Sequence, residues 1–246
     1  MNELLFFVSI IVIFGIEVLV ERIFKKDGLY CWVAIFSIIA NIEVTKNISL
    51  FGFNDWVTLG NVSFASIFLA TDILSVKYGY KESKKAVNIG VCSALLFILI
   101  MQLDLLFKPS ESGEFIHTSM KNLFGTDSIF IWVTISSVLM FYLSNLADVW
   151  LFDKLRKKTK GRHLWFANNI ATITCNCLEN FVFVILGYYV LQLIFIGKTI
   201  YTISQCLAIA GTTCMFEIII SLLDTPFLYL AKHKFKKNKD ASEKGE

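Results

Sequence analysis

The chain has 246 residues, of which 56% are hydrophobic and 15% aromatic, whereas only 17% are charged. Soluble domains carry roughly 45–50% apolar and about 25% charged residues, so this composition, with a mean hydropathy of +0.64, disfavours a soluble globular protein. The formal net charge is +3, and the basic residues are not interleaved with aromatic residues as in nucleic-acid-binding proteins. We therefore predict a polytopic membrane protein with no nucleic-acid partner.

Seven apolar stretches are each long enough to cross a bilayer as a helix, which takes about 20 residues. In chain order they are Leu4–Val20, Leu29–Thr45, Val62–Tyr78, Ala86–Phe107, Ile129–Phe152, Phe166–Phe195 and Thr202–Ala231. The first is not a secretory signal, because no basic segment precedes it and Glu17, Glu21 and Arg22 occupy the place of a cleavage site. The stretches are continuously apolar rather than alternating, which predicts an all-α membrane protein rather than a β-barrel.

The basic residues divide unevenly between alternate loops. Of the 23 Lys and Arg residues, 19 fall in the loops Glu21–Gly28, Lys77–Lys85 and Asp153–Trp165 and in the tail after Ala231. Loops rich in Lys and Arg are cytoplasmic and contact anionic lipid. The N-terminus is then outside and the C-terminus cytoplasmic, which requires an odd number of spans. We predict one transmembrane domain over residues 1–231 of a bacterial cytoplasmic (inner) membrane protein, followed by a basic, mobile tail over residues 232–246.

No Lys, Arg or His lies well within a predicted span, but acids fall within several spans, among them Glu17, Asp72, Asp104, Asp148, Glu179, Glu217 and Asp224. An ionisable group in the hydrocarbon costs about 2.5–3.5 kcal/mol on insertion scales and therefore indicates a functional site. Glu17 and Asp104 lie near span ends, where we expect their side chains to reach water.

Helical spacing places the polar residues of four spans on one face of each helix. The four stripes are Phe64, Phe68, Thr71/Asp72 and Ser75; Ser137, Phe141, Asn145 and Asp148; Asn169, Thr172, Asn176 and Glu179; and Thr213, Glu217, Ser221 and Asp224. Polar stripes cannot face lipid, so we expect them to face one another or water. We also expect the sixth span to begin as a tilted or interrupted helix and Asp224-Thr225-Pro226 to mark a kink or a helix end.

Two of the stripes share a motif in which an amide precedes an acid by one helical turn, as Asn145 precedes Asp148 and Asn176 precedes Glu179. Together, an amide and a carboxylate can bind a flat ligand rich in N–H donors. The lack of intramembrane bases favours a cationic or donor-rich substrate, or H⁺ or Na⁺. An interhelical hydrogen-bond clamp is the alternative. The candidates for stacking on such a ligand are Phe64, Phe68, Trp150 and Phe183.

Motifs of the common enzyme classes are missing from the sequence. It contains no HExxH, GxGD, P-loop or GxGxxG pattern, and its three histidines lie outside the spans. We expect the six cysteines, all in spans, to behave as small apolar residues rather than as metal ligands. We therefore predict no enzymatic activity, no cofactor and no metal site.

Several blocks of sequence carry a recognisable pattern. They are Leu59-Gly60-Asn61-Val62 through Thr71-Asp72-Ile73-Leu74-Ser75 to Tyr78-Gly79, Asp148-Val149-Trp150-Leu151-Phe152, and Leu164-Trp165 with Asn168-Asn169 and Thr172. The pattern resembles that of the queuosine precursor transporters, also called the vitamin uptake transporter family. Two further blocks, Gly28–Trp32 and Asp224-Thr225-Pro226, resemble its Clostridium-like branch. The resemblance covers residues 28–232, which implies a six-helix family core plus one added N-terminal helix.

The chain departs from the usual pattern of the family at several positions. Asn145 and Asn176 stand where the family tends to have Gln, and Glu179 stands where Asp or Asn is commoner. Val76 replaces a common Glu, and Ala167 a common Arg.

The resemblance implies import of a 7-deazaguanine queuosine precursor (7-cyano- or 7-aminomethyl-7-deazaguanine, or queuine) for tRNA modification. We expect the substrate to be bound by Asp72, Asn145, Asp148, Asn169, Asn176 and Glu179, and Glu217 or Asp224 to couple transport to protons. Two alternatives stay open: a substrate-capture subunit energised by an ATPase module, and a non-transporting membrane receptor or assembly protein. A homodimer is compatible with the sequence.

Overall fold

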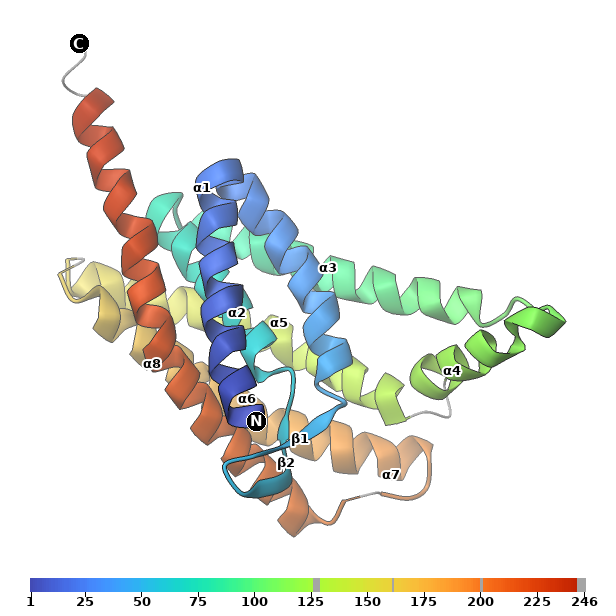
Figure 1. Ribbon diagram of the computed structural model, residues 1–246. Helices are drawn as coiled ribbons and strands as arrows, with labels where there is room; N and C mark the ends of the chain where they lie inside the picture. The colour runs from blue at the N-terminus through green and yellow to red at the C-terminus, as the bar shows by residue number, and fades with distance from the viewer. Residues whose placement is uncertain (126–128, 161, 200, 243–246) are drawn as a thin grey trace.

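The computed structural model describes residues 1–125, 129–160, 162–199 and 201–242, with side chains throughout these ranges except at 54–56, 129–130 and 233–242. The chain forms a bundle of helices with a small β-hairpin at one end (Figure 1). The elements are α1 (Asn2–Glu43), β1 (Asn47–Leu50), β2 (Phe53–Thr58), α2 (Asn61–Lys77), α3 (Tyr80–Asp104), η1 (Glu111–Gly113), α4 (Glu114–Phe124), α5 (Ile129–Lys158), α6 (Leu164–Ile185), η2 (Leu186–Val190), α7 (Leu191–Phe195) and α8 (Ile203–Ser242). The final predicted tail residues, 243–246, lie outside the described ranges.

The first two predicted spans both lie in α1, which reverses direction at Lys25 (Figure 1). Lys25 has a φ of +57°, in a region that L side chains rarely adopt. Gly28 allows the two halves of α1 to approach each other closely at the reversal. A Cβ at this position would lie 2.7 Å from the Phe24 Cβ and 3.0 Å from the Val20 carbonyl oxygen. The second half of α1 therefore returns to the end of the bundle where the chain begins.

The remaining predicted spans correspond to α2, α3, α5, α6 with α7, and α8. Within the described ranges, five helical segments are long and apolar enough to cross a membrane: Asn2–Glu43, Tyr80–Asp104, Ile131–Lys158, Leu164–Phe195 and Ile203–Lys232. The structure agrees with the predicted all-α, multi-pass membrane architecture.

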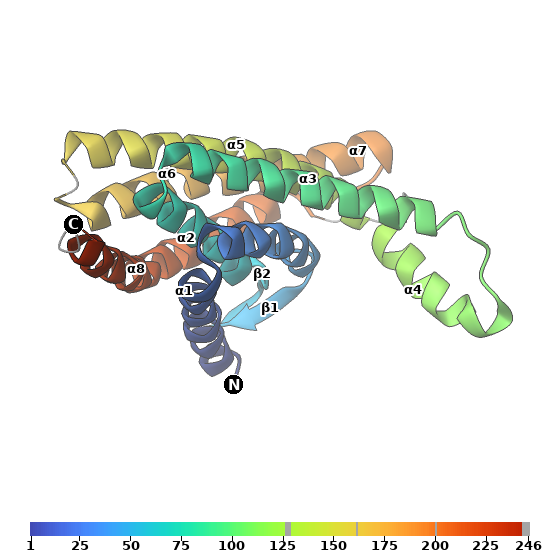
Figure 2. The same cartoon turned by 90° about the horizontal axis from the view of Figure 1, so that it is seen from above.

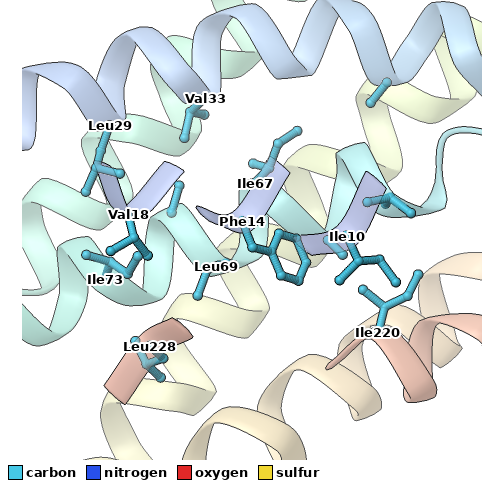
Figure 3. Packing of buried hydrophobic residues seen from close by; sticks show 14 of the residues in the cluster. Ile10, Phe14, Val18, Leu29, Val33, Ile67, Leu69, Ile73, Ile220 and Leu228 are labelled. Carbon is cyan, nitrogen blue, oxygen red and sulfur yellow. The ribbon is translucent and has the colours of Figure 1, made fainter. Parts of the chain in front are cut away.

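Helix α2 runs through the centre of the bundle and contacts protein on all sides (Figure 2). All but three of its 17 residues are buried, whereas α3 exposes a row of leucines on its outer face. The main apolar core joins α2 to the first half of α1 and to α8, with Phe14 packed near Ile67 and Leu69 (Figure 3). A central helix can carry polar side chains on several faces, because none of its faces has to contact lipid.

Two local expectations, an interruption at the start of the sixth span and a helix end at Asp224-Thr225-Pro226, were wrong. The sixth predicted span is continuous through its first half, and its irregularity is the π-helical turn η2 in the second half. The helix α8 also continues through Pro226 to Ser242 instead of ending there. Membrane helices tolerate proline where neighbouring groups satisfy the freed backbone carbonyl, which for Pro226 is that of Leu222.

Two elements lie outside the predicted set, the β-hairpin and α4. The strands β1 and β2 pair in antiparallel register, with Asn47 opposite Thr58. The helix α4 follows α3 and folds back beside its end, where the Gln102 amide donates to the Phe124 carbonyl at 2.6 Å. The hairpin matters for the site described below, because it covers the end of α2 that is nearest to the N-terminus (Figure 1).

Candidate functional site

Polar side chains of α5, α6 and α8 meet next to the central helix α2. The Thr172 hydroxyl donates to Asp148 at 3.2 Å, which joins α6 to α5. The Asn168 amide donates to Asp224 at 2.9 Å, and the Asn169 amide donates to the Thr225 hydroxyl at 2.8 Å, which joins α6 to α8. As predicted, the polar stripes of these helices face one another rather than the surroundings of the bundle.

Several buried oxygen atoms in this region have no hydrogen-bond partner among the described residues. They are both carboxylate oxygens of Asp72, one each of Asp148 and Asp224, and the amide oxygens of Asn145 and Asn176. All five residues are almost fully buried, and none of them forms an ion pair within the described ranges. An unsatisfied buried acceptor is costly, so this set can accept hydrogen bonds from a ligand that supplies donors.

The acids are close enough to influence one another electrostatically. The carboxyl group of Asp72 interacts electrostatically with those of Asp148 and Asp224, and the carboxyl group of Asp148 interacts with that of Glu179. Glu179 in turn lies near Glu217, whose carboxylate accepts the Asn180 amide at 2.5 Å. Five acids in a low-dielectric interior without a basic partner repel one another when charged, which favours binding of a cation or a proton.

A small cavity of about 20 Å³ lies at the end of this polar region that faces the hairpin. Glu179 and Glu217 line it together with the three aromatic candidates Phe64, Phe68 and Phe183. A water molecule needs roughly 10–15 Å³ of such space, whereas small-molecule sites measure about 300–1,000 Å³. The central cavity, as we call it, therefore holds little more than one water in this conformation.

Trp150, the fourth aromatic candidate, is not part of this region. Its side chain is 53% exposed, and Lys154 lies over its ring with the ammonium 4.6 Å from the ring centroid. The helical face that carries Asn145 and Asp148 points inward, and Trp150, two residues after Asp148, therefore points outward. The stacking role predicted for Trp150 is incompatible with this position.

Glu17 also departs from expectation, because it does not reach water. It is 0% exposed and accepts a hydrogen bond from the Ser66 hydroxyl at 2.8 Å, while the Trp32 indole donates to Ser66 at 2.6 Å. The first half of α1 packs against α2, so the end of the first predicted span is surrounded by protein. Asp104, at the end of α3, is exposed as expected.

The basic end of the bundle is closed by contacts that sequence patterns do not reveal. Lys77 and Glu21 form a buried ion pair at 2.5 Å, and the Tyr78 hydroxyl donates to the same Glu21 oxygen at 2.9 Å. The Arg156 guanidinium donates to the Ser75 carbonyl at 2.6 Å, which ties α5 to α2. These partners are more than 50 residues apart in sequence, and no local signal pairs them.

Two cysteines are paired, contrary to the expectation that all six behave as small apolar residues. A disulfide joins Cys177 of α6 to Cys214 of α8, close in sequence to Glu179 and Glu217. The pairing depends on how α6 and α8 pack against each other, so local sequence spacing does not reveal it. Among the described residues, no group of three or more His, Cys, Asp or Glu side chains is arranged to hold a metal ion.

Comparison of the sequence with known proteins identifies a family to which the chain is similar. A family profile described as "Putative vitamin uptake transporter" matches residues 58–231. A Bacillus subtilis (strain 168) protein named "Probable queuosine precursor transporter" is 33% identical over 223 residues, which cover 90% of this chain and 91% of that protein. The "Queuosine precursor transporter" of Escherichia coli (strain K12) is 25% identical over 162 residues, 64% of this chain and 68% of that protein. No solved structure gives a significant match.

These relatives are named as transporters, which agrees with the prediction that the chain is not an enzyme. The matched profile covers most of the chain, and the Bacillus relative aligns over nearly the whole of it. The polar stripes of α5, α6 and α8 and the central helix α2 all fall within the matched residues. The chain therefore belongs to the vitamin uptake transporter family, the family of the queuosine precursor transporters.

Proposed function

We propose that this protein imports a 7-deazaguanine queuosine precursor across the bacterial cytoplasmic membrane for tRNA modification. The observation that carries the proposal is the set of buried acceptor oxygens of Asp72, Asp148, Asn145 and Asn176, which have no partner among the described residues. A 7-deazaguanine is flat, carries several N–H donors on one edge, and in its aminomethyl form carries a cation. The names of the relatives support the same substrate class.

The proposed topology has seven spans, with α1 crossing twice and α2 crossing as a short, protein-surrounded helix. The Lys25 reversal, the α2–α3 turn, the α5–α6 turn and the end of α8 then lie on the cytoplasmic side, where the basic residues gather. The N-terminus and the β-hairpin lie outside.

In the proposed complex, Asp148 with Asn145 and Glu179 with Asn176 bind the donor edge of the ligand from two helices. Asp72 and Asn169 complete the polar wall, and Phe64, Phe68 and Phe183 pack against the flat ring. The central cavity has to widen for this, since it holds about 20 Å³. Glu217 and Asp224, held by Asn180 and Asn168, are the residues we assign to proton coupling.

The test is uptake of labelled 7-cyano-, 7-aminomethyl-7-deazaguanine and queuine in a strain unable to make queuosine, with the queuosine content of tRNA as a second readout. Loss of a charge-assisted hydrogen bond costs about 1.5–3 kcal/mol, so Asp148→Asn and Glu179→Gln should each lower uptake roughly 10- to 100-fold. Trp150→Leu is the matched control, because the Trp150 ring lies outside the polar region.

Wild-type uptake rates in both Asp148→Asn and Glu179→Gln membranes, at equal protein levels, would contradict the proposal. Transport by the purified protein alone in proteoliposomes would exclude the capture-subunit alternative. Binding without flux in the same proteoliposomes would instead favour a receptor.

A further inference from the structure

A second, larger cavity lies under the β-hairpin. It has a volume of about 340 Å³, is partly open, and is lined by the first turns of α1, the end of α1, the two strands and the start of α2. This hairpin cavity, as we call it, falls within the range of about 300–1,000 Å³ typical of small-molecule sites, whereas the central cavity holds about 20 Å³. Space for a ligand therefore exists at the hairpin end of the bundle rather than at the buried acids.

The lining of the hairpin cavity combines an apolar wall with one carboxylate, that of Glu43, and one basic side chain, that of Lys46. Leu5, Phe6 and Val62 form part of the wall. The Glu43 carboxylate accepts the buried Ser63 hydroxyl at 2.6 Å and forms no ion pair with any described residue. A half-buried carboxylate held by one hydroxyl keeps free acceptor capacity, since it has about four lone-pair sites. The cavity is thus suited to a small apolar-faced molecule that carries N–H donors for Glu43 and an acceptor for Lys46.

Only a thin partition separates the two cavities. Thr58 lines both, and its hydroxyl donates to the Asn61 side-chain oxygen at 2.6 Å. Asn61 also lines the central cavity, and its buried amide nitrogen has no partner among the described residues. The residue after Glu43, Val44, faces the central cavity as well. Thr58 and Asn61 therefore lie between the larger space and the cavity that Glu179 and Glu217 line.

The opposite end of the polar region is closed by stronger contacts. The Lys77–Glu21 ion pair and the Arg156 bond to the Ser75 carbonyl tie three helices together. Charge-assisted bonds are roughly twice as strong as the neutral hydroxyl–amide bond of Thr58 and Asn61. A ligand would meet less resistance entering from the hairpin cavity than from the basic end.

We propose that the hairpin cavity is an entry site, where the donor groups of the transported ligand bind Glu43 before the ligand passes the Thr58–Asn61 partition to the central acids. The inference rests on the proposed function for the identity of the ligand. Entry-site residues set how readily dilute ligand is captured, whereas central residues set the transport step itself. Substitutions in the entry site should therefore change mainly the uptake KM, whereas substitutions of the central acids should change mainly the maximal rate.

The experiment measures concentration-dependent uptake of labelled 7-aminomethyl-7-deazaguanine by cells carrying the full chain. Glu43→Gln, which keeps the shape of the side chain, should raise KM about tenfold and leave the maximal rate within about twofold, as expected for a lost charge-assisted bond. Ser9→Phe, which fills the cavity from α1, should also raise KM. The matched controls are Asp104→Asn, an exposed acid at a helix end, and Ser119→Phe on the exposed α4.

The outcomes are separable. If the wild type takes up the compound and both Glu43→Gln and Ser9→Phe keep its KM, the entry site is refuted while the proposed function stands. If the wild type takes up none of the three deazapurines, the proposed function fails and takes the ligand assignment with it. If Ser9→Phe does not reach the membrane, the isosteric Glu43→Gln decides alone.

Discussion

Two carboxylates mark the two ends of the contact between α1 and α2, and they are satisfied in opposite ways. Glu21, at the basic end, is paired with the Lys77 ammonium and the Tyr78 hydroxyl, and the side chains of the ion pair are 1% and 8% exposed. Glu43, at the hairpin end, accepts one hydroxyl from Ser63 and borders a cavity of about 340 Å³. The contacts of Glu21 both fall on one carboxylate oxygen, and the other oxygen is buried in protein where no ligand can reach it. Glu43 instead borders open space that a ligand can enter.

The different surroundings of Glu21 and Glu43 explain how the contact between α1 and α2 can be closed at one end and accessible at the other. A buried ion pair is tightly held only while both partners are present, because either charge alone is strongly disfavoured. A carboxylate bound to a single hydroxyl beside open space keeps its hydration and can exchange water for a ligand donor. The charged pair therefore fixes the basic end, and the hairpin end is left free to bind.

The largest expected effect comes from breaking the pair at the basic end. Lys77→Met leaves Glu21 buried and uncompensated, so it should destabilise the folded protein by about 3–5 kcal/mol. Thermal unfolding of the purified protein in detergent measures this loss. The double variant Glu21→Leu with Lys77→Met should recover most of it, since both charges are then gone.

The control for this variant is Lys157→Met, whose ion pair with Asp153 is exposed on the lysine side. Exposed pairs contribute about 0–1 kcal/mol. A loss at Lys77→Met no larger than that at Lys157→Met would show that the basic end is not held by the buried pair.

The next effect concerns what holds the hairpin end, which is close backbone contact rather than charge. A Cβ added at Gly60 would lie 2.9 Å from the Ala40 carbonyl oxygen and 3.1 Å from the Val44 nitrogen. Gly60→Ala should therefore push α2 away from the end of α1 and cost about 1–3 kcal/mol, as overpacking does. It should also change uptake, because the displaced segment borders both cavities.

Gly15→Ala provides the matched control on α1, because nothing lies within 4 Å of a Cβ there. Alanine is favoured over glycine in a helix by roughly 0.5–1 kcal/mol, so this variant should be neutral or slightly stabilising. Equal behaviour of the two variants in unfolding and uptake would contradict the role of Gly60.

Much of this comparison depends on relations that hydropathy and helical spacing cannot reveal. Apolar length and period predicted the helices, and the i, i+3, i+4 spacing predicted that Asp148, Thr172 and Asp224 face inward, since both properties are local. The same reasoning placed Glu17 in water, because span position alone does not say which neighbour covers a helix end. Ser66 and Trp32 cover it here.

Residues whose role depends on a distant partner were missed for the same reason. Glu21 and Lys77 were assigned to loops by hydropathy, and only the packing of α1 on α2 makes them a buried pair. Glu43 lies inside the second predicted span, yet it is not part of a polar stripe. Its cavity is lined in part by the β-hairpin, which no strong strand pattern in the sequence predicts. Cys177 and Cys214 are likewise joined by helix packing rather than by spacing.

The smallest expected effects come from removing the one hydroxyl that donates to each carboxylate, which compares Glu21 and Glu43 directly. Tyr78→Phe leaves Glu21 with Lys77 alone in a dry site, so it should cost about 1 kcal/mol of stability and leave the uptake KM unchanged. Ser63→Ala leaves Glu43 beside open space, where water can replace the hydroxyl, so its stability cost should stay below that of Tyr78→Phe. The uptake KM should instead rise roughly threefold, because an unheld carboxylate is less well ordered for the ligand. Unfolding in detergent and uptake kinetics on the same two variants measure both quantities. A larger stability loss in Ser63→Ala than in Tyr78→Phe would mean that Glu43 is as dry as Glu21, and the hairpin end would then be as closed as the basic end.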